Sequence, residues 1–287
     1  FLTVVLERAF NMRDGFGREI DYMRISVIDS CNLNCYYCNP CDNNEHCHAL
    51  NILSVKEVLC IVRAATRLGI KHFRLTGGEP LLHPQLDEMV LQIKKIPGVS
   101  SVSLTTNAVL LAQHAKWLKE AGIDSINVSL DTIDASEYER ITKKPLLEEV
   151  KHGINAAIEC GIRVKINVVL TPQTDVVALT RYVAKKGTDI RFIEMMPVGE
   201  GHTNGVEPYK KVIGTLSKLY GEPCRINTEK TKEINSGNDK RKIPDNGPAE
   251  YYIFPELGIR VGLIQAIHGK FCDTCNRIRV TADGRLM

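Results

Sequence analysis

Six short stretches of the chain alternate hydrophobic and polar residues, and segments with the hydrophobic spacing of helices separate them. Alternation with a period of two is typical of strands, and hydrophobic residues three and four apart are typical of helices. The strand pattern occurs in residues 22–28, 72–75, 102–105, 125–130, 164–170 and 190–195. The helical pattern occurs in residues 54–69, 85–96, 112–121, 147–160, 176–186 and 209–219.

The first helix has the clearest boundary signals. Ser54 and Glu57 form the capping-box pattern at its start, and Gly69 marks its end. Repeated β-α units predict a parallel sheet with right-handed crossovers, because a parallel strand needs a crossover connection. Six such units predict an α/β fold, an incomplete TIM-type (β/α)6 barrel, over residues 1–220.

The pattern changes after Gly221. Residues 228–246 are polar and charged without periodicity, which predicts a loop. Short strand patterns follow in residues 250–254 and 260–264. We therefore expect a small C-terminal α+β unit over residues 221–287.

One face of the six predicted strands is largely polar. Alternate residues of a strand point to opposite faces, and helices must cover the apolar one. The lumen of a closed barrel is normally filled with branched apolar side chains, so a polar lumen indicates a bound polar ligand. The alternative is that these positions are exposed edges. The polar set comprises Arg24, Ser26, Arg74, Thr76, Ser103, Thr105, Asn107, Asn127, Ser129, Asp131, Lys165, Asn167, Glu194 and Met196.

Composition limits the function classes. The 287 residues are 44% hydrophobic and 25% charged, which is ordinary for a globular protein, and no apolar run is long enough for a membrane helix. A net charge of +3 gives no general attraction to nucleic acid or membrane, so neither is an expected partner. We expect a cytoplasmic protein.

The ten cysteines fall mainly into two groups, at positions 31–47 and 272–275. In a reducing compartment such groups indicate metal binding rather than disulfides. Cys60 and Cys160 lie in helical patterns and are expected to be small core residues.

The first group supplies a candidate metal site. Cys31, Cys35 and Cys38 directly follow the first strand, at the end of a barrel that normally carries the chemistry. A [4Fe–4S] cluster takes one thiolate per iron, so three cysteines leave one iron open for a methionine-like ligand. The alternative is a zinc site with Cys41 as the fourth ligand.

The Cys-x3-Cys-x2-Cys spacing, with an aromatic residue before the last cysteine, resembles the radical S-adenosylmethionine (SAM) superfamily. The turn Thr76-Gly-Gly-Glu-Pro80 resembles the glycine-rich SAM-binding turn of that superfamily. Further motifs resemble the GTP 3′,8-cyclase family of molybdenum-cofactor biosynthesis, and they begin at Asp14, Tyr22, Arg74, Leu104, Asn127, Val164, Arg191 and Phe271.

The resemblance implies a lyase-class enzyme that forms a cyclic nucleotide triphosphate, (8S)-3′,8-cyclo-7,8-dihydroguanosine 5′-triphosphate, from GTP. It implies two [4Fe–4S] clusters, held by Cys31, Cys35 and Cys38 and by Cys272, Cys275 and a third cysteine beyond Met287. It implies SAM contacts at Tyr37, Gly78, Ser129 and Met196. It implies GTP contacts at Arg24, Arg74, Thr105, Lys165, Arg277, Ile278 and Arg279. No further catalytic residue is expected.

Other expected partners follow from the same resemblance: a low-potential electron donor, the next enzyme of molybdopterin synthesis and a second copy of the chain in a homodimer. The loop with Cys41, His46, Cys47 and His48 is expected to be a lid without a metal, the alternative being an accessory site. Two other functions compete with the cyclase, a radical SAM enzyme that modifies peptides and a zinc-binding scaffold without catalysis.

Overall fold

The computed structural model describes residues 12–38, 51–196, 206–226, 248–269, 271, 273 and 275–287. Six neighbouring strands form a parallel sheet in chain order, as the sequence predicted. They are β1 (Tyr22–Ser26), β2 (His72–Thr76), β3 (Ser101–Thr106), β4 (Ser125–Ser129), β5 (Val164–Leu170) and β6 (Asp189–Glu194).

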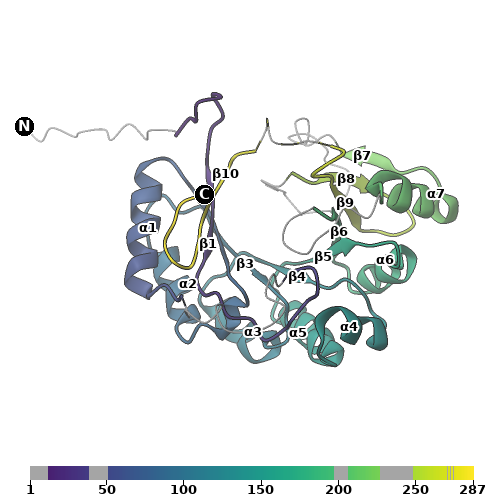
Figure 1. Cartoon of the computed structure of the whole chain (residues 1–287), viewed down its shortest axis with the longest axis horizontal. Coiled ribbons are helices and arrows are strands. Elements are labelled where there is room, and N and C mark those ends of the chain that lie inside the picture. The colour runs from purple at the N-terminus through teal and green to yellow at the C-terminus, as the bar shows by residue number, and fades with distance from the viewer. Residues whose placement is uncertain are drawn as a thin grey trace, which may run out of the picture.

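The helices lie on the outer side of the curved sheet (Figure 1). Between them and the strands lies one hydrophobic core of fully buried side chains such as Phe73, Leu104 and Phe192. The helices are α1 (Val55–Arg67), α2 (Leu86–Lys94), α3 (Leu111–Glu120), α4 (Ala135–Thr142), α5 (Leu147–Glu159), α6 (Val176–Lys185) and α7 (Gly214–Tyr220). A 3-10 turn covers Pro80–Leu82, and a π-helical turn at Tyr209–Ile213 leads into α7.

Four strands of the C-terminal part extend the same sheet at both ends. They are β7 (Cys224–Ile226), β8 (Glu250–Ile253), β9 (Arg260–Ile264) and β10 (Arg277–Val280). Strand β10 pairs with β1, whereas β9 pairs with β6 and is followed outward by β8 and β7. Strands β10 and β7 therefore end the ten-stranded order without pairing to each other, and the barrel is open.

Local signals explain most element boundaries. The capping box at the start of α1 is confirmed, because Ser54 accepts from the backbone of Glu57 while the Glu57 carboxylate accepts from the backbone of Ser54. The sequence did not predict α4, which Asp134 caps, or the strands β7 and β10. The expectation of a core position for Cys60 is wrong, because its side chain is exposed on α1, whereas Cys160 packs against the core.

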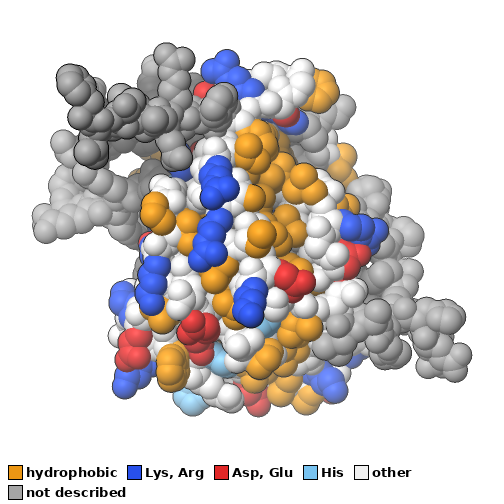
Figure 2. Space-filling view, turned by 90° about the vertical axis from the view of Figure 1, so that its left-hand side faces the viewer, with side chains coloured by type: hydrophobic (Ala, Val, Ile, Leu, Met, Phe, Trp, Pro, Cys, Tyr) orange, Lys and Arg blue, Asp and Glu red, His pale blue; other side chains and the backbone are white. Residues whose placement is uncertain are grey.

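The outer surface is mixed in character. The side of the molecule that carries α1 shows basic, acidic and hydrophobic side chains interspersed (Figure 2). Among the described residues, no helix combines the length and the hydropathy needed to span a bilayer.

The contact between α3 and α5 depends on a glycine. A Cβ atom added to Gly153 of α5 would lie 2.4 Å from the carbonyl oxygen of Ala108. Gly214, in the first turn of α7, has no atom within 4 Å of such a Cβ. We expect Gly153→Ala to lower the free energy of unfolding by about 1–3 kcal/mol through overpacking, despite the better helix propensity of alanine.

Gly214→Ala is the matched control, and we expect it to raise the free energy of unfolding by up to about 1 kcal/mol. Chemical denaturation of both variants measures the difference. An equal gain in stability for the two variants would contradict the close packing at Gly153.

Candidate active site

The inner face of the sheet opens into a polar pocket of about 650 Å³, a volume typical of small-molecule sites. The polar-face prediction is confirmed for most positions of strands β1 to β5, because all of their predicted polar residues except Ser26 and Asn127 line this pocket. The pocket brings together most of the residues that the sequence singled out: Arg24, Cys31, Cys35, Tyr37, Cys38, Arg74, Gly78, Thr105, Ser129, Lys165 and Arg277.

The prediction for the sixth strand is wrong in phase. Arg191 and Ile193 of β6 line the pocket, whereas Phe192 is buried in the core. The register explains this, because Asn167 of β5 pairs with Arg191 and register partners share a face. Glu194 is therefore polar but does not line the pocket.

Glu194 has another partner. Its buried carboxylate accepts hydrogen bonds from the backbone N–H groups of Ile267 and His268, at 2.7 and 3.1 Å, and contacts the imidazole of His268. These donors come from the C-terminal segment and draw Glu194 away from the pocket. Met196, just after β6, is 43% exposed and does not line the pocket either.

The last strand divides its residues between two environments. Arg277 lines the pocket, and Ile278 packs against the hydrophobic core. Arg279 is exposed and pairs in register with Arg24. Cys275 is a free, partly buried thiol just before β10. Cys272 and the loop residues Cys41, His46, Cys47 and His48 lie outside the described residues.

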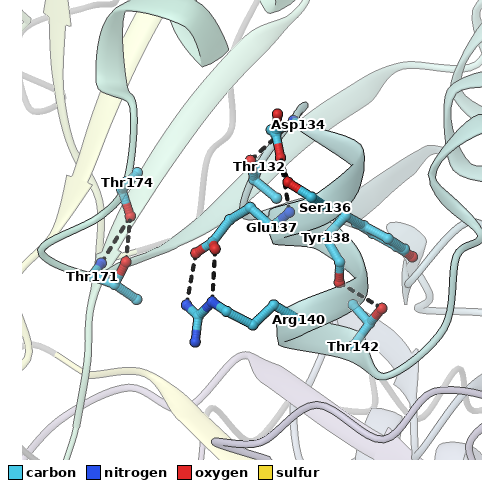
Figure 3. Close-up of polar contacts among 9 residues, drawn as sticks. All are labelled: Thr132, Asp134, Ser136, Glu137, Tyr138, Arg140, Thr142, Thr171 and Thr174. Carbon is cyan, nitrogen blue, oxygen red and sulfur yellow. Dashed lines mark hydrogen bonds and ion pairs between the residues drawn. The ribbon is translucent and has the colours of Figure 1, made fainter.

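The cysteine loop rests on α4. The backbone N–H of Asn34 donates to the carbonyl of Thr142 at 3.0 Å, and the guanidinium carbon of Arg140 lies 5.6 Å from the centroid of the Tyr36 ring. Arg140 is held in turn by two 2.7 Å hydrogen bonds to Glu137 on the same helix (Figure 3). A helix that the sequence analysis missed thus supports the candidate metal ligands.

The three thiols suit a soft metal group. All three line one pocket, and burial raises the pKa of Cys35 to about 12. Such thiols stay protonated unless a metal replaces the proton. The backbone N–H of Leu33 donates to Cys31 Sγ at 3.5 Å, and the Asn107 amide donates to the same sulfur at 3.8 Å. Donors of this kind stabilise a coordinated thiolate, so the loop fits an iron–sulfur cluster.

The glycine turn after β2 lies directly against the end of β1. A Cβ atom at Gly77 would lie 2.3 Å from the carbonyl oxygen of Ile28, and one at Gly78 would lie 2.2 Å from that of Ser30. The N–H of Gly78 donates to Ile28 at 2.8 Å. These two positions therefore require glycine because the backbones of the two loops of the site are in direct contact.

Glu79 joins this turn to the next strand. Its fully buried carboxylate accepts from the Thr106 hydroxyl at 2.6 Å and from the backbone N–H of Asn107 at 2.7 Å. Burial raises the pKa of Glu79, and these hydrogen bonds oppose the increase. The Asn107 amide donates to Asn32 at 2.7 Å, so a single carboxylate orders the loops after β2 and β3 around the cysteines.

A second, partly buried carboxylate holds the aromatic residue of the cysteine motif. The Tyr37 hydroxyl donates to Asp131, which also accepts from the backbone N–H of Val169 at 2.7 Å. Desolvation raises the pKa of Asp131 to about 6, although both hydrogen bonds act in the opposite direction. Tyr37 is therefore tied to the ends of β4 and β5.

Cations crowd the other part of the pocket. Burial and the neighbouring Arg279 and Arg74 lower the pKa of Arg24 to about 10. The Nε atom of Arg24 is buried without a hydrogen-bond partner among the described residues. The guanidinium carbons of Arg74 and Arg277 lie 5.8 and 5.5 Å from the centroid of the Tyr22 ring. Such a cluster is chemically suited to a polyanion with several oxygen acceptors.

Several pocket residues were not predicted from the sequence pattern, including Tyr22, His72, Arg163 and Arg191. Arg191 donates to Asn167 at 3.0 Å, so it belongs to the polar network of β5 and β6. The strand register would have indicated some of them, because Tyr22 is the register partner of both His72 and Arg277.

Two family models match the chain. Residues 25–179 match the Radical SAM superfamily, and residues 188–287 match Molybdenum Cofactor Synthesis C. The chain is 37% identical over 276 residues to GTP 3′,8-cyclase of Clostridium perfringens, which covers 95% of the chain and 81% of the relative. It is 38% identical over 282 residues to GTP 3′,8-cyclase of Pelotomaculum thermopropionicum, which covers 96% of the chain and 82% of the relative.

Solved structures show the same fold. Streptococcus suis SuiB bound to S-adenosylmethionine has a TM-score of 0.64 at 14% identity over 93% of the chain, which spans 60% of SuiB. Methylornithine synthase has a TM-score of 0.55 at 16% identity, covering 72% of this chain and 64% of that one. At these identities the likeness concerns the fold alone.

The carboxyl of Asp131 makes stability depend on pH. Its pKa is about 6 in the folded chain against 3.8 as the ordinary value, so the folded state holds a proton that the unfolded state has lost. The associated stability is present below about pH 4 and is lost as the pH rises through 6. The free energy of unfolding of the parent should therefore fall as the pH rises through this range, by at most about 1.4 kcal/mol per pH unit. We expect Asp131→Asn to lack this fall.

The measurement is the free energy of unfolding at pH 5 and pH 7. Asp134→Asn is the control, because hydrogen bonds lower the pKa of exposed Asp134 from 3.8 and it stays ionised across this range. Equal pH slopes for Asp131→Asn and the parent would contradict the assignment.

Proposed function

The chain belongs to the GTP 3′,8-cyclase family within the radical SAM superfamily, and we propose that its polar pocket is the site where GTP is cyclised. The enzyme is a radical SAM GTP 3′,8-cyclase and carries out the first step of molybdenum-cofactor biosynthesis. The observation that supports this location is a single pocket lined by three cysteines and by several cations.

Superfamily membership implies a [4Fe–4S] cluster and SAM as cofactors. Cys31, Cys35 and Cys38 would hold the cluster, and SAM would contact Tyr37, Gly78, Ser129 and Met196. When bound, these cofactors supply the 5′-deoxyadenosyl radical that abstracts a hydrogen atom. Two carboxylates of the chain order the loops around them: Glu79 accepts a hydrogen bond from Asn107, and Asp131 accepts one from Tyr37.

GTP would bind to the cations of the inner face. Arg24, Arg74, Lys165 and Arg277 line the pocket on four different strands, so they reach a ligand from several directions. Their charges match a triphosphate, and a guanidinium fork also matches a purine edge. Thr105, Ile278 and Arg279 complete the proposed set, Ile278 through its backbone because its side chain packs against the core.

A second cluster is proposed for the C-terminal unit, residues 221–287, with the radical SAM unit in residues 1–220. Cys272 and Cys275 would supply two of its ligands. A low-potential electron donor, the next enzyme of molybdopterin synthesis and a cytoplasmic location remain predictions from the sequence, as does a homodimer.

The competing functions have less support. A peptide-modifying radical SAM enzyme is consistent with the fold of SuiB, but 14% identity concerns the fold alone. A zinc scaffold does not account for the match to the radical SAM superfamily. Anaerobic incubation of the protein with SAM, a reductant and GTP, followed by mass analysis of the nucleotide product, tests the proposed function.

Cys35→Ala should abolish the release of 5′-deoxyadenosine from SAM, because a cluster held by three thiolates loses a ligand. Anaerobic incubation with SAM and dithionite measures this product. Cys224→Ala is the control, since Cys224 is exposed on β7 and does not line the pocket. Release of the product by Cys35→Ala at the parent rate would refute the cluster assignment.

Arg74→Ala and Lys165→Ala should weaken GTP binding about ten- to a hundredfold, because hydrogen bonds to charged groups contribute about 1.5–3 kcal/mol each. SAM binding should stay nearly unchanged. Separate titrations of GTP and SAM into each variant distinguish the two effects. Arg67→Ala, at an exposed position in the last turn of α1, should leave both affinities intact. Parent-like GTP affinity in Arg74→Ala and Lys165→Ala would refute the nucleotide site.

A further inference from the structure

Lys165 is a buried cation on β5, with 5% of its surface exposed, at the wall of the pocket. A lysine side chain is a flexible stem with a point charge, so its ammonium group needs neighbours that fix its position. Asp189 of β6 lies opposite Lys165 in the strand register, and Arg260 of β9 follows across the sheet. Three charged residues thus lie side by side on neighbouring strands.

Arg260 engages the carboxylate that lies opposite Lys165. Both Asp189 oxygens accept from Arg260 Nε at 3.1 Å, the terminal nitrogen of Arg260 adds an ion pair, and the backbone N–H of Arg260 donates at 3.2 Å. Asp189 and Arg260 are 5% and 7% exposed, so this pair is a fixed part of the interior.

An aromatic ring contacts both cations. Lys165 Nζ lies 6.0 Å from the centroid of the Tyr251 ring, and the guanidinium carbon of Arg260 lies 5.7 Å from it. Tyr251 belongs to β8 and is 2% exposed. A cation over a desolvated aromatic face is attracted by the ring quadrupole more strongly than at an exposed site.

The neighbouring strand is shaped to admit this ring. Gly262 of β9 is the register partner of Tyr251 on one side and of Arg191 on the other. A Cβ atom at Gly262 would lie 2.9 Å from Tyr251 Cε1 and 2.8 Å from Arg191 Cγ. A residue larger than glycine at position 262 would displace the Tyr251 ring. Gly262 therefore leaves the space that the ring occupies next to Lys165.

We propose that Tyr251 is a positioning residue that holds the ammonium group of Lys165 in place for GTP, with the Asp189–Arg260 pair supporting the ring. Tyr251 is not among the residues that line the pocket, so it acts through Lys165. It lies within residues 188–287, whereas Lys165 lies within residues 25–179, so the C-terminal family segment sets the geometry of a residue in the radical SAM segment. This inference rests on the proposed function.

A series of ring substitutions tests the proposal. Tyr251→Phe keeps the aromatic face, and replacement of Tyr251 by mono-, di- and trifluorinated phenylalanines then weakens the quadrupole with little change of shape. GTP and SAM are titrated separately into the anaerobically reconstituted protein. We expect Tyr251→Phe to bind GTP within about twofold of the parent, and the trifluorinated variant to bind it about five- to tenfold more weakly, with SAM affinity unchanged.

Two controls separate positioning from a general effect on packing. In a Lys165→Met background the fluorinated series should give one constant GTP affinity, because Arg260 still contacts the ring but does not line the pocket, and the cation that would reach GTP is gone. The same fluorinated series at Tyr252, a buried neighbour that packs against Tyr209, should leave GTP affinity unchanged.

The outcomes distinguish this inference from the proposed function. The positioning role would be overturned if GTP affinity did not change with fluorination in the protein that keeps Lys165. It would also be overturned if fluorination weakened GTP binding equally in the Lys165→Met protein. In both cases GTP binding itself would stand. No GTP binding by the parent would overturn the proposed function itself and the inference with it. Tyr251→Leu adds an independent check, since it should lose about tenfold in GTP affinity while Tyr251→Phe does not.

Discussion

The concentration of positive charge on the inner face of the sheet is the constraint on which much of this structure depends. Arg24 is partly buried among Arg74, Arg277 and Arg279, and desolvation and these like charges lower its pKa. Aromatic neighbours offset part of the repulsion between the cations of the pocket. Tyr22 contacts two arginines at one end of the pocket, and Tyr251 contacts Lys165 and Arg260 at the other. The remaining imbalance favours a polyanionic ligand.

The candidate metal loop depends on a different kind of support. Desolvation raises the pKa of all three thiols, so they resist ionisation, and the surroundings must fix them before a metal can replace their protons. Glu79 and Asp131 provide this order. Glu79 accepts two hydrogen bonds from the segment after β3, and Asp131 accepts one from Tyr37 and one from Val169. Because both lie at the ends of parallel strands, the same edge of the sheet that presents the cysteines also presents the groups that hold them.

The sequence was a good guide wherever periodicity and register agreed. The six parallel strands, the polar inner face of β1 to β5 and the capping box at Ser54 follow from local patterns. The error at β6 arose because Glu194 looked like a lumen residue, although tertiary hydrogen bonds from Ile267 and His268 place it elsewhere. Tyr22 and Tyr251 were missed because their role depends on cations from other strands, which no local pattern contains.

The pairing of β10 with β1 has a consequence for how the protein is made. Asn276 donates to Asp21 across a separation of 255 residues, and Arg277 pairs with Tyr22 in the same ladder. While the ribosome is still translating the chain, β1 keeps one open edge, and such edges favour pairing with foreign strands. The polar pocket thus gains Arg277 only after β10 has been translated and has paired with β1. Emergence of β10 from the ribosome, rather than the folding of the first six strands, would then set the earliest moment at which the pocket is complete.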